Sequence, residues 1–125
     1  MPGPHVTTIP IHPWGPHRVW FRYMSASVSK GSASGTAEES EVLASMRAEG
    51  LAPYRWSNAP HDTYEPHSHA YHKVLYCLRG SIRFALTREG QSVELEAGDR
   101  MDLEAGTEHS AFVGPDGADC VEAQR

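Results

Sequence analysis

The chain has 125 residues and a formal net charge of −5 at pH 7, which fits a single domain with a modest core. The acidic balance argues against nonspecific binding to nucleic acid and against docking on anionic lipid, because both need clustered Lys and Arg. No apolar run approaches the length of a membrane-spanning helix. Cys77 and Cys120 form no CxxC motif and lie in strand-like sequence, so we expect free, packed thiols in a reducing, cytoplasmic compartment.

Residues 1–35 differ in composition from the rest of the chain. Residues 1–23 are rich in proline and show neither a helical nor a strand period, and Ser25–Gly35 is rich in Ser, Gly and Ala. Such composition is typical of flexible linkers. We therefore expect residues 1–35 to form a flexible tail and linker, of which the first 23 residues contribute little to folding. The alternative is that translation begins at Met24.

The first regular element is expected directly after this segment. Thr36 with Glu39 three residues later is typical of a capping box at a helix N-terminus. An apolar stripe at helical spacing follows, and Gly50 can end the helix. The stripe consists of Val42, Leu43 and Met46. The pattern predicts one helix near residues 37–49, within an N-terminal segment of helix and connection over residues 36–53.

From Tyr54 onward the sequence consists of short, strand-like stretches between turns. Glycine or a Gly-containing cluster marks the turns at Gly80, residues 87–91 and residues 114–117. The main predicted strands cover residues 73–78, 81–86, 92–95, 100–103, 109–113 and 120–123. Many short strands without interleaved helices predict an all-β sandwich or barrel. A jelly-roll β-barrel over residues 54–125 satisfies this pattern.

The histidines carry the clearest chemical signal. His67 and His69 are two positions apart on an expected extended segment, so their side chains point the same way. His109 lies about forty residues on and could complete one face of a metal ion from a neighbouring strand. Neutral imidazole is a favoured ligand for Zn, Cu, Fe and Ni. The alternative is a hydrogen-bonded histidine set that holds no metal.

The spacing of these residues resembles the two motifs of the cupin superfamily. The first two histidines and Gly80 fit the first motif, and Gly98, Gly106 and His109 fit the second. The resemblance covers roughly residues 54–123. It implies a small single-domain cupin, a cupin-like jelly-roll β-barrel with one N-terminal helix, and a metal centre on the three histidines.

Four positions depart from the family motifs. His61 stands in place of the first glycine and Lys73 in place of the glutamate ligand. Glu104 stands in place of the proline and Val113 in place of the terminal asparagine. The departures leave the expected fold intact. They remove the fourth ligand of the family site and leave three histidines.

Lys73 and its neighbours leave several site arrangements open. By resemblance Lys73 faces the cavity, and three arrangements are open for it. In the first it turns aside and pairs with an acid such as Glu104, and in the second it stays near the site with a lowered pKa and acts as an acid or base. In the third it meets an anionic ligand in a site that binds no metal. Ideal strand alternation turns His72 away from the site, whereas a bulge would make it an additional ligand. Arg83 and Arg100 are expected on the exposed faces of their strands; the alternative is that they face a carboxylate in the cavity.

Two function classes follow. The first is a metal-dependent enzyme that uses Fe, Mn, Ni or Zn and acts on a small anionic metabolite; the resemblance implies a dioxygenase or isomerase type. The second is a noncatalytic small-molecule-binding module. We also expect a homodimer, because Val74, Tyr76 and Leu78 form an apolar outward face. The alternative is that the helix near residues 37–49 covers that face.

Overall fold

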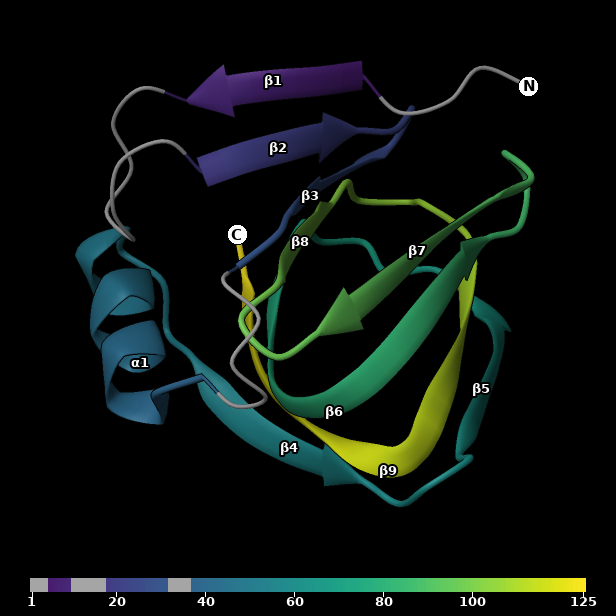
Figure 1. Cartoon of the computed structure of the whole chain (residues 1–125). Coiled ribbons are helices and arrows are strands. Elements are labelled where there is room, and N and C mark those ends of the chain that lie inside the picture. The colour runs from purple at the N-terminus through teal and green to yellow at the C-terminus, as the bar shows by residue number, and fades with distance from the viewer. Residues whose placement is uncertain (1–4, 10–17, 32–36) are drawn as a thin grey trace.

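The strands form one curved antiparallel sheet, with a single helix against its outer side in the part of the chain described here (Figure 1). The computed structural model describes residues 5–9, 18–31 and 37–125. The elements are β1 (His5–Ile9), β2 (Arg18–Arg22), β3 (Ala26–Ser29), α1 (Glu39–Ala48), β4 (Tyr54–Asn58), β5 (Thr63–His67), β6 (Lys73–Leu86), β7 (Gln91–Glu96), β8 (Arg100–Leu103) and β9 (His109–Gln124). Hydrogen-bonded neighbours follow the order β1-β2-β3-β8-β6-β9-β4, and β5 pairs with β9 while β7 pairs with β6. The predicted all-β barrel with one helix is confirmed.

β6 and β9 form the central strand pair of the barrel, because they pair along almost their whole length (Figure 1). The sequence predicted strand ends at Gly80 and at residues 114–117, but both strands continue through these positions. Gly80 has a φ of 76°, and the register of the ladder shifts on either side of it. A side chain at Gly80 would collide with the Gly117 carbonyl oxygen. The glycine therefore bends a continuous strand by a bulge and does not end it.

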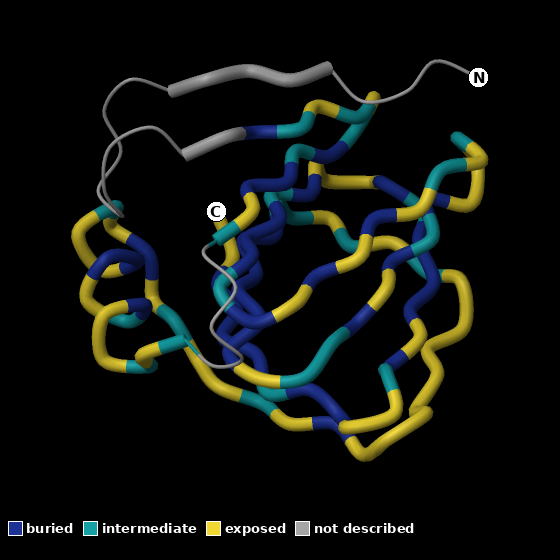
Figure 2. The backbone as a smooth tube through the Cα atoms, viewed as in Figure 1, coloured by how far each residue is buried: buried dark blue, intermediate teal, exposed yellow. Residues whose placement is uncertain are grey.

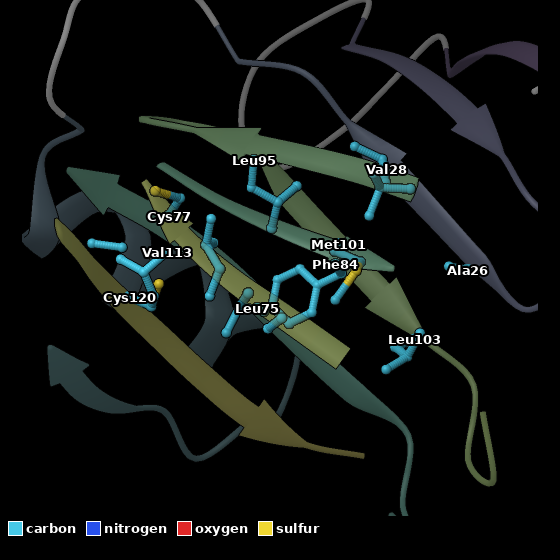
Figure 3. Packing of buried hydrophobic residues seen from close by; sticks show 14 of the residues in the cluster. Ala26, Val28, Leu75, Cys77, Phe84, Leu95, Met101, Leu103, Val113 and Cys120 are labelled. Carbon is cyan, nitrogen blue, oxygen red and sulfur yellow. The ribbon is translucent and has the colours of Figure 1, made fainter. Parts of the chain in front are cut away.

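The barrel interior holds the larger of two apolar clusters. Buried and exposed residues alternate along β7, as expected for a strand with one face on the core (Figure 2). Leu75, Phe84 and Met101 pack in this interior (Figure 3). Cys77 and Cys120 lie opposite each other across β6 and β9 and are both buried and free. The prediction that the cysteines pack as free thiols is thus confirmed.

α1 covers the outer face of β6 and the end of β9. Its buried residues Val42 and Met46 belong to the second apolar cluster, which also contains Val74, Tyr76 and Leu78. The apolar face that suggested a homodimer is therefore covered by the helix within the same chain. The helix begins at Glu39, two residues later than expected, and Glu38 is its N-cap. Thr36, the predicted cap, lies outside the described residues.

The prediction of a flexible tail and linker is wrong for residues 18–31. β2 pairs with β3, and β3 pairs in turn with β8 at the edge of the barrel. Ala26 and Val28 join the interior cluster, and Trp20 is also buried. The Ser- and Ala-rich composition was misleading because Ala26 and Val28, two positions apart, both pack into the interior once β3 pairs with β8. Tertiary pairing has overridden the local composition.

Arg100 is also placed differently from the prediction. Its side chain is 3% exposed and donates hydrogen bonds to Glu49, Asp102 and the Tyr76 hydroxyl. Glu49 is the C-cap of α1, so this partly buried network fastens the end of the helix to β8. Arg83 is exposed, as expected. The described part of the chain has no helix with the length and apolar character that crossing a bilayer requires.

Candidate metal centre

Three histidine side chains meet beside the paired strands β5 and β9. His67 ends β5 and is paired in register with His109, the first residue of β9. His69 lies in the loop after β5, where its carbonyl oxygen accepts a 2.7 Å hydrogen bond from the Gly106 N–H. That bond joins the two segments that carry the histidines. One ring nitrogen from each histidine lies within 4.8 Å of the other two, so the structure brings together all three predicted ligands.

Backbone carbonyl groups fix the orientation of two rings. Nδ1 of His67 lies 2.7 Å from the Glu65 carbonyl oxygen. Nδ1 of His109 lies 2.8 Å from the Thr107 carbonyl oxygen. Because a carbonyl oxygen only accepts, each Nδ1 carries the hydrogen and each Nε2 keeps a lone pair. A hydrogen bond from one ring nitrogen to a carbonyl group is typical of histidines that bind a metal ion through the other ring nitrogen.

The remaining ring nitrogens are short of partners. Among the described residues, the buried Nε2 atoms of His69 and His109 have no hydrogen-bond partner. A buried polar atom without a partner is costly, and such atoms in native proteins commonly meet an ion, a water molecule or a ligand. Two orphaned nitrogens that belong to a compact three-histidine cluster fit the donor set of a divalent transition metal.

The electrostatic surroundings keep these rings neutral. Burial lowers the pKa of His109 to about 4, against the raising effect of its hydrogen bond to the Thr107 carbonyl, and the charge of Lys73 lowers it further. Burial also lowers the pKa of His69, with contributions from Lys73 and His67. Metal ions bind the neutral form of imidazole. The two rings are therefore in their metal-binding form at neutral pH.

Lys73 faces the same cavity as the histidines, as predicted, but its partner is a residue that the sequence interpretation missed. Lys73 Nζ lies 3.5 Å from a Glu122 carboxylate oxygen, and both side chains are less than a tenth exposed. In the ladder, Lys73 is opposite Gln124, so Glu122 is its diagonal neighbour two residues along β9. Long side chains can reach across that diagonal on one face of a sheet.

Glu122 organises a polar cluster at this wall of the cavity. It accepts a 2.6 Å hydrogen bond from the Tyr54 hydroxyl and a 3.2 Å hydrogen bond from Trp56 Nε1. Burial, followed by the hydrogen bond to Glu122, raises the pKa of Tyr54. The signal that could have revealed Glu122 is a single acid in the otherwise apolar stretch Cys120–Ala123, where alternation places it on the same face as Cys120.

The other two candidate site residues lie elsewhere. The suggested pairing of Lys73 with Glu104 is not observed; Glu104 is half-exposed and lies 3.6 Å from Arg22. His72 is 3.8 Å from an Asp102 carboxylate oxygen and is not part of the three-histidine cluster. Simple strand alternation therefore describes His72 correctly, and no bulge turns it inward.

A cavity of about 360 Å³ opens beside the histidines, Lys73 and Glu122. Its volume is in the range of small-molecule sites. Much of its wall is aromatic, with side chains from β4, β5, β6 and the loop after β5. These aromatic residues are Tyr54, Trp56, Tyr64, Tyr71 and Phe84. The arrangement can hold a metal ion on one side and a small ligand next to it.

One departure from the sequence motif has a direct structural explanation. His61, which stands in place of the first motif glycine, has a φ of 64°. This left-handed conformation is the one that glycine adopts most easily, and histidine is among the residues that tolerate it. His61 thus adopts at this turn a backbone conformation that glycine could also adopt.

Comparisons with known proteins agree with the barrel. The family model for the cupin domain matches residues 54–120. The polyketide cyclase RemF from Streptomyces resistomycificus superposes with a TM-score of 0.53 at 16% identity, over 95% of this chain and 73% of that one. A Rhizobium leguminosarum protein of unknown function gives a TM-score of 0.54 at 16% identity, over 59% of this chain and 68% of that one.

KdgF from a Halomonas species gives a TM-score of 0.50 at 19% identity, over 84% of this chain and 85% of that one. At such identities the structural likeness establishes the fold and not the activity. No curated protein sequence matches this chain.

Proposed function

We propose that this chain, which belongs to the cupin family, holds one divalent transition metal ion on His67, His69 and His109. Fe, Mn, Ni and Zn are the candidate ions, because imidazole ligands suit several metals of this series. We further propose that the cavity beside the ion takes a small anionic metabolite and that the protein is a metal-dependent enzyme of the dioxygenase or isomerase type.

The observation that carries the metal proposal is that two orphaned Nε2 atoms belong to a cluster of three histidines whose ring nitrogens lie within 4.8 Å of one another. A purely structural histidine cluster would use both nitrogens of each ring in hydrogen bonds, since buried polar groups are normally satisfied. Here the Nδ1 atoms of His67 and His109 are bound to carbonyl groups, whereas the Nε2 atoms of His69 and His109 have no partner among the described residues. In a site for a single metal ion, the ring nitrogens that coordinate the ion would likewise lack other hydrogen-bond partners.

The number of protein ligands supports an enzyme. Structural metal sites are usually closed by four protein ligands, whereas catalytic sites keep a position open for water or substrate. Three neutral ligands also leave the full +2 charge on the ion. A bound ion would therefore act as a Lewis acid toward an anionic group in the cavity. Lys73 and Glu122 would hold or orient protons and charges in the same cavity.

A noncatalytic binding module is the second candidate. The buried pair of Lys73 and Glu122 within an aromatic cavity supports it, because these groups could bind a small molecule without any ion. Assembly into a homodimer also remains a prediction. It would need a surface other than the face of β6 that α1 covers.

The test uses the full chain purified without a histidine tag. The protein is dialysed against a chelator, reloaded separately with Fe, Mn, Ni or Zn, and analysed for bound metal by mass spectrometry. Each loaded form is then incubated with a panel of small carboxylic acids, and O₂ consumption and substrate conversion are recorded. We expect one ion per chain and turnover by at least one form. Stoichiometric metal without any turnover would favour the binding module, and no bound metal would reject the metal site.

A further inference from the structure

The side chains that line the cavity indicate the type of ligand as well as its size. Its aromatic wall includes two pairs of rings in contact. Trp56 and Tyr64 meet edge to face with centroids 6.4 Å apart, and Tyr71 stacks on His69 at 4.9 Å with an angle of 22° between the planes. Aromatic side chains interact favourably with a further ring in stacked or edge-on arrangements. The wall therefore favours a flat, unsaturated ligand over an aliphatic one of similar size.

Glu122 holds two rings of this wall, those of Tyr54 and Trp56. The polar edges of Tyr54 and Trp56 both donate to its carboxylate. An aromatic ring whose polar atom is fixed in this way has little rotational freedom left to lose when a ligand binds. Such preorganisation lowers the entropic cost of binding. Glu122 thus positions the rings of Tyr54 and Trp56.

Lys73 supplies the charge on the same wall. Its ammonium group has three N–H donors, and its distance of 3.5 Å to Glu122 exceeds the 2.7–2.9 Å that is typical of a close charge-assisted hydrogen bond. Glu122 also divides its acceptor capacity among Tyr54 and Trp56. Lys73 therefore keeps donor capacity for a second oxyanion in the cavity.

We propose that this cavity binds a planar, conjugated anion, a ring that carries a carboxylate or phenolate oxygen, with the oxygen on Lys73 and the ring among Trp56, Tyr64 and Tyr71. The inference rests on the proposed function, because it names the ligand class of the same site. It adds Lys73 as the residue that selects for charge and the rings of Trp56, Tyr64 and Tyr71 as the groups that select for planarity.

The test uses benzoate as the probe, with two isosteres that each lack one feature. Benzamide is planar but uncharged, and cyclohexanecarboxylate is charged but not planar. Binding is measured by NMR titration of the full chain, once free of metal and once loaded with Zn²⁺. In the metal-free wild type we expect benzoate to bind about tenfold more tightly than benzamide, the effect of one charge-assisted contact. We expect benzoate to bind about threefold more tightly than cyclohexanecarboxylate.

Two lysine variants separate the role of Lys73 from a general loss of positive charge. The sequence has two lysines, and Lys30 forms an ion pair with Asp99 at 2.6 Å, outside the cavity. We expect Lys73→Met to weaken benzoate about tenfold and leave benzamide unchanged, and Lys30→Met to change neither. Should Lys73→Met not fold, the comparison of the three probes on the wild type still decides whether the cavity selects for a charge and for a planar ring.

Other outcomes separate the two proposals. Equal affinity for benzoate and benzamide in the wild type, or unchanged benzoate binding by folded Lys73→Met, would overturn the role of Lys73. Equal affinity for benzoate and cyclohexanecarboxylate would overturn the aromatic selection. Benzoate binding that needs Zn²⁺ and ignores Lys73 would reject this inference and leave the metal site standing. Binding that depends on Lys73 in a protein that takes up no metal would support the inference and reject the metal site.

Discussion

Lys73 and Glu122 form a buried ion pair across β6 and β9, with Nζ 3.5 Å from the carboxylate. Removing one partner of such a pair leaves an uncompensated charge, which typically costs about 3–5 kcal/mol, whereas removing both costs much less. We expect Lys73→Met and Glu122→Gln each to lower the free energy of unfolding by roughly 3 kcal/mol. The double variant should lose clearly less than the sum of the two. Urea unfolding of the four proteins gives the coupling directly, and additive losses would show that the pair does not interact.

The same contact changes what Lys73→Glu is expected to do. From the motif spacing we expect this substitution to supply a fourth metal ligand and to tighten metal binding relative to the wild type. In the metal-free protein the new carboxylate lies beside Glu122, and like charges in a buried site are unfavourable. We therefore expect lower stability without metal and a larger rise in Tm on loading.

Lys73→Ala is the control for this prediction and should retain the metal with a smaller rise in Tm. Thermal unfolding with and without Zn²⁺ measures both effects. A metal-induced rise for Lys73→Glu no larger than that of the wild type would contradict the prediction.

The lowered pKa of His109 predicts a pH-dependent stability of the metal-free protein. The folded state keeps His109 neutral down to about pH 4, whereas the unfolded chain takes up a proton near pH 6.5. Stability is therefore fully present above pH 6.5 and is lost as the pH falls toward 4, by roughly 3 kcal/mol. Urea unfolding between pH 4 and 8 gives the slope. His109→Gln should show a shallower dependence over this range, and a slope equal to that of the wild type would exclude His109 as the cause.

The placement of Trp20 reverses the expectation that residues 1–23 contribute little to folding. Trp20 is 8% exposed, and the Arg100 guanidinium lies 5.6 Å from its ring centroid. A chain that starts at Met24 lacks this ring and β2, so we expect it to lose more than about 2 kcal/mol of stability, because burial of a Trp side chain is worth several kcal/mol. Denaturant unfolding of the two chains measures the loss.

Met24→Ala in the full chain is a matched control, because Met24 is exposed. This variant should unfold like the wild type. Equal stability of the full and shortened chains would restore the original interpretation of a tail that does not take part in the fold.

The sequence predicted what depends on local pattern and motif spacing. His67, His69 and His109 were found because the two motifs fix them relative to glycines such as Gly98 and Gly106, both of which adopt positive φ. The sequence also indicated that the outward face of β6 is apolar. It left two partners open for that face, a second copy of the chain and the helix. Alternation alone was enough to direct His72 away from the site.

The missed features depend on pairing between distant segments. Nothing local to Glu122 shows that β9 brings it to Lys73, 49 positions earlier, or that Tyr54 and Trp56 hold it. Arg100 looks like an exposed strand residue until Glu49 is placed beside it. β3 looks like a linker until β8 pairs with it. In each case the decisive contact is made by a residue far away in the chain.

We expect three histidines, and not their neighbour His72, to bind one metal ion. The direct measurement is the metal content of the chelator-treated wild type and of single His→Ala variants after loading with Zn²⁺ and desalting. His72→Ala is the matched control, because His72 lies next to Asp102 and outside the cluster. We predict one ion per chain in the wild type and in His72→Ala, and loss of stoichiometric metal in the variants of His67, His69 and His109. A wild type that takes up no metal, or a His109→Ala variant that binds it as well as the wild type, would contradict the account.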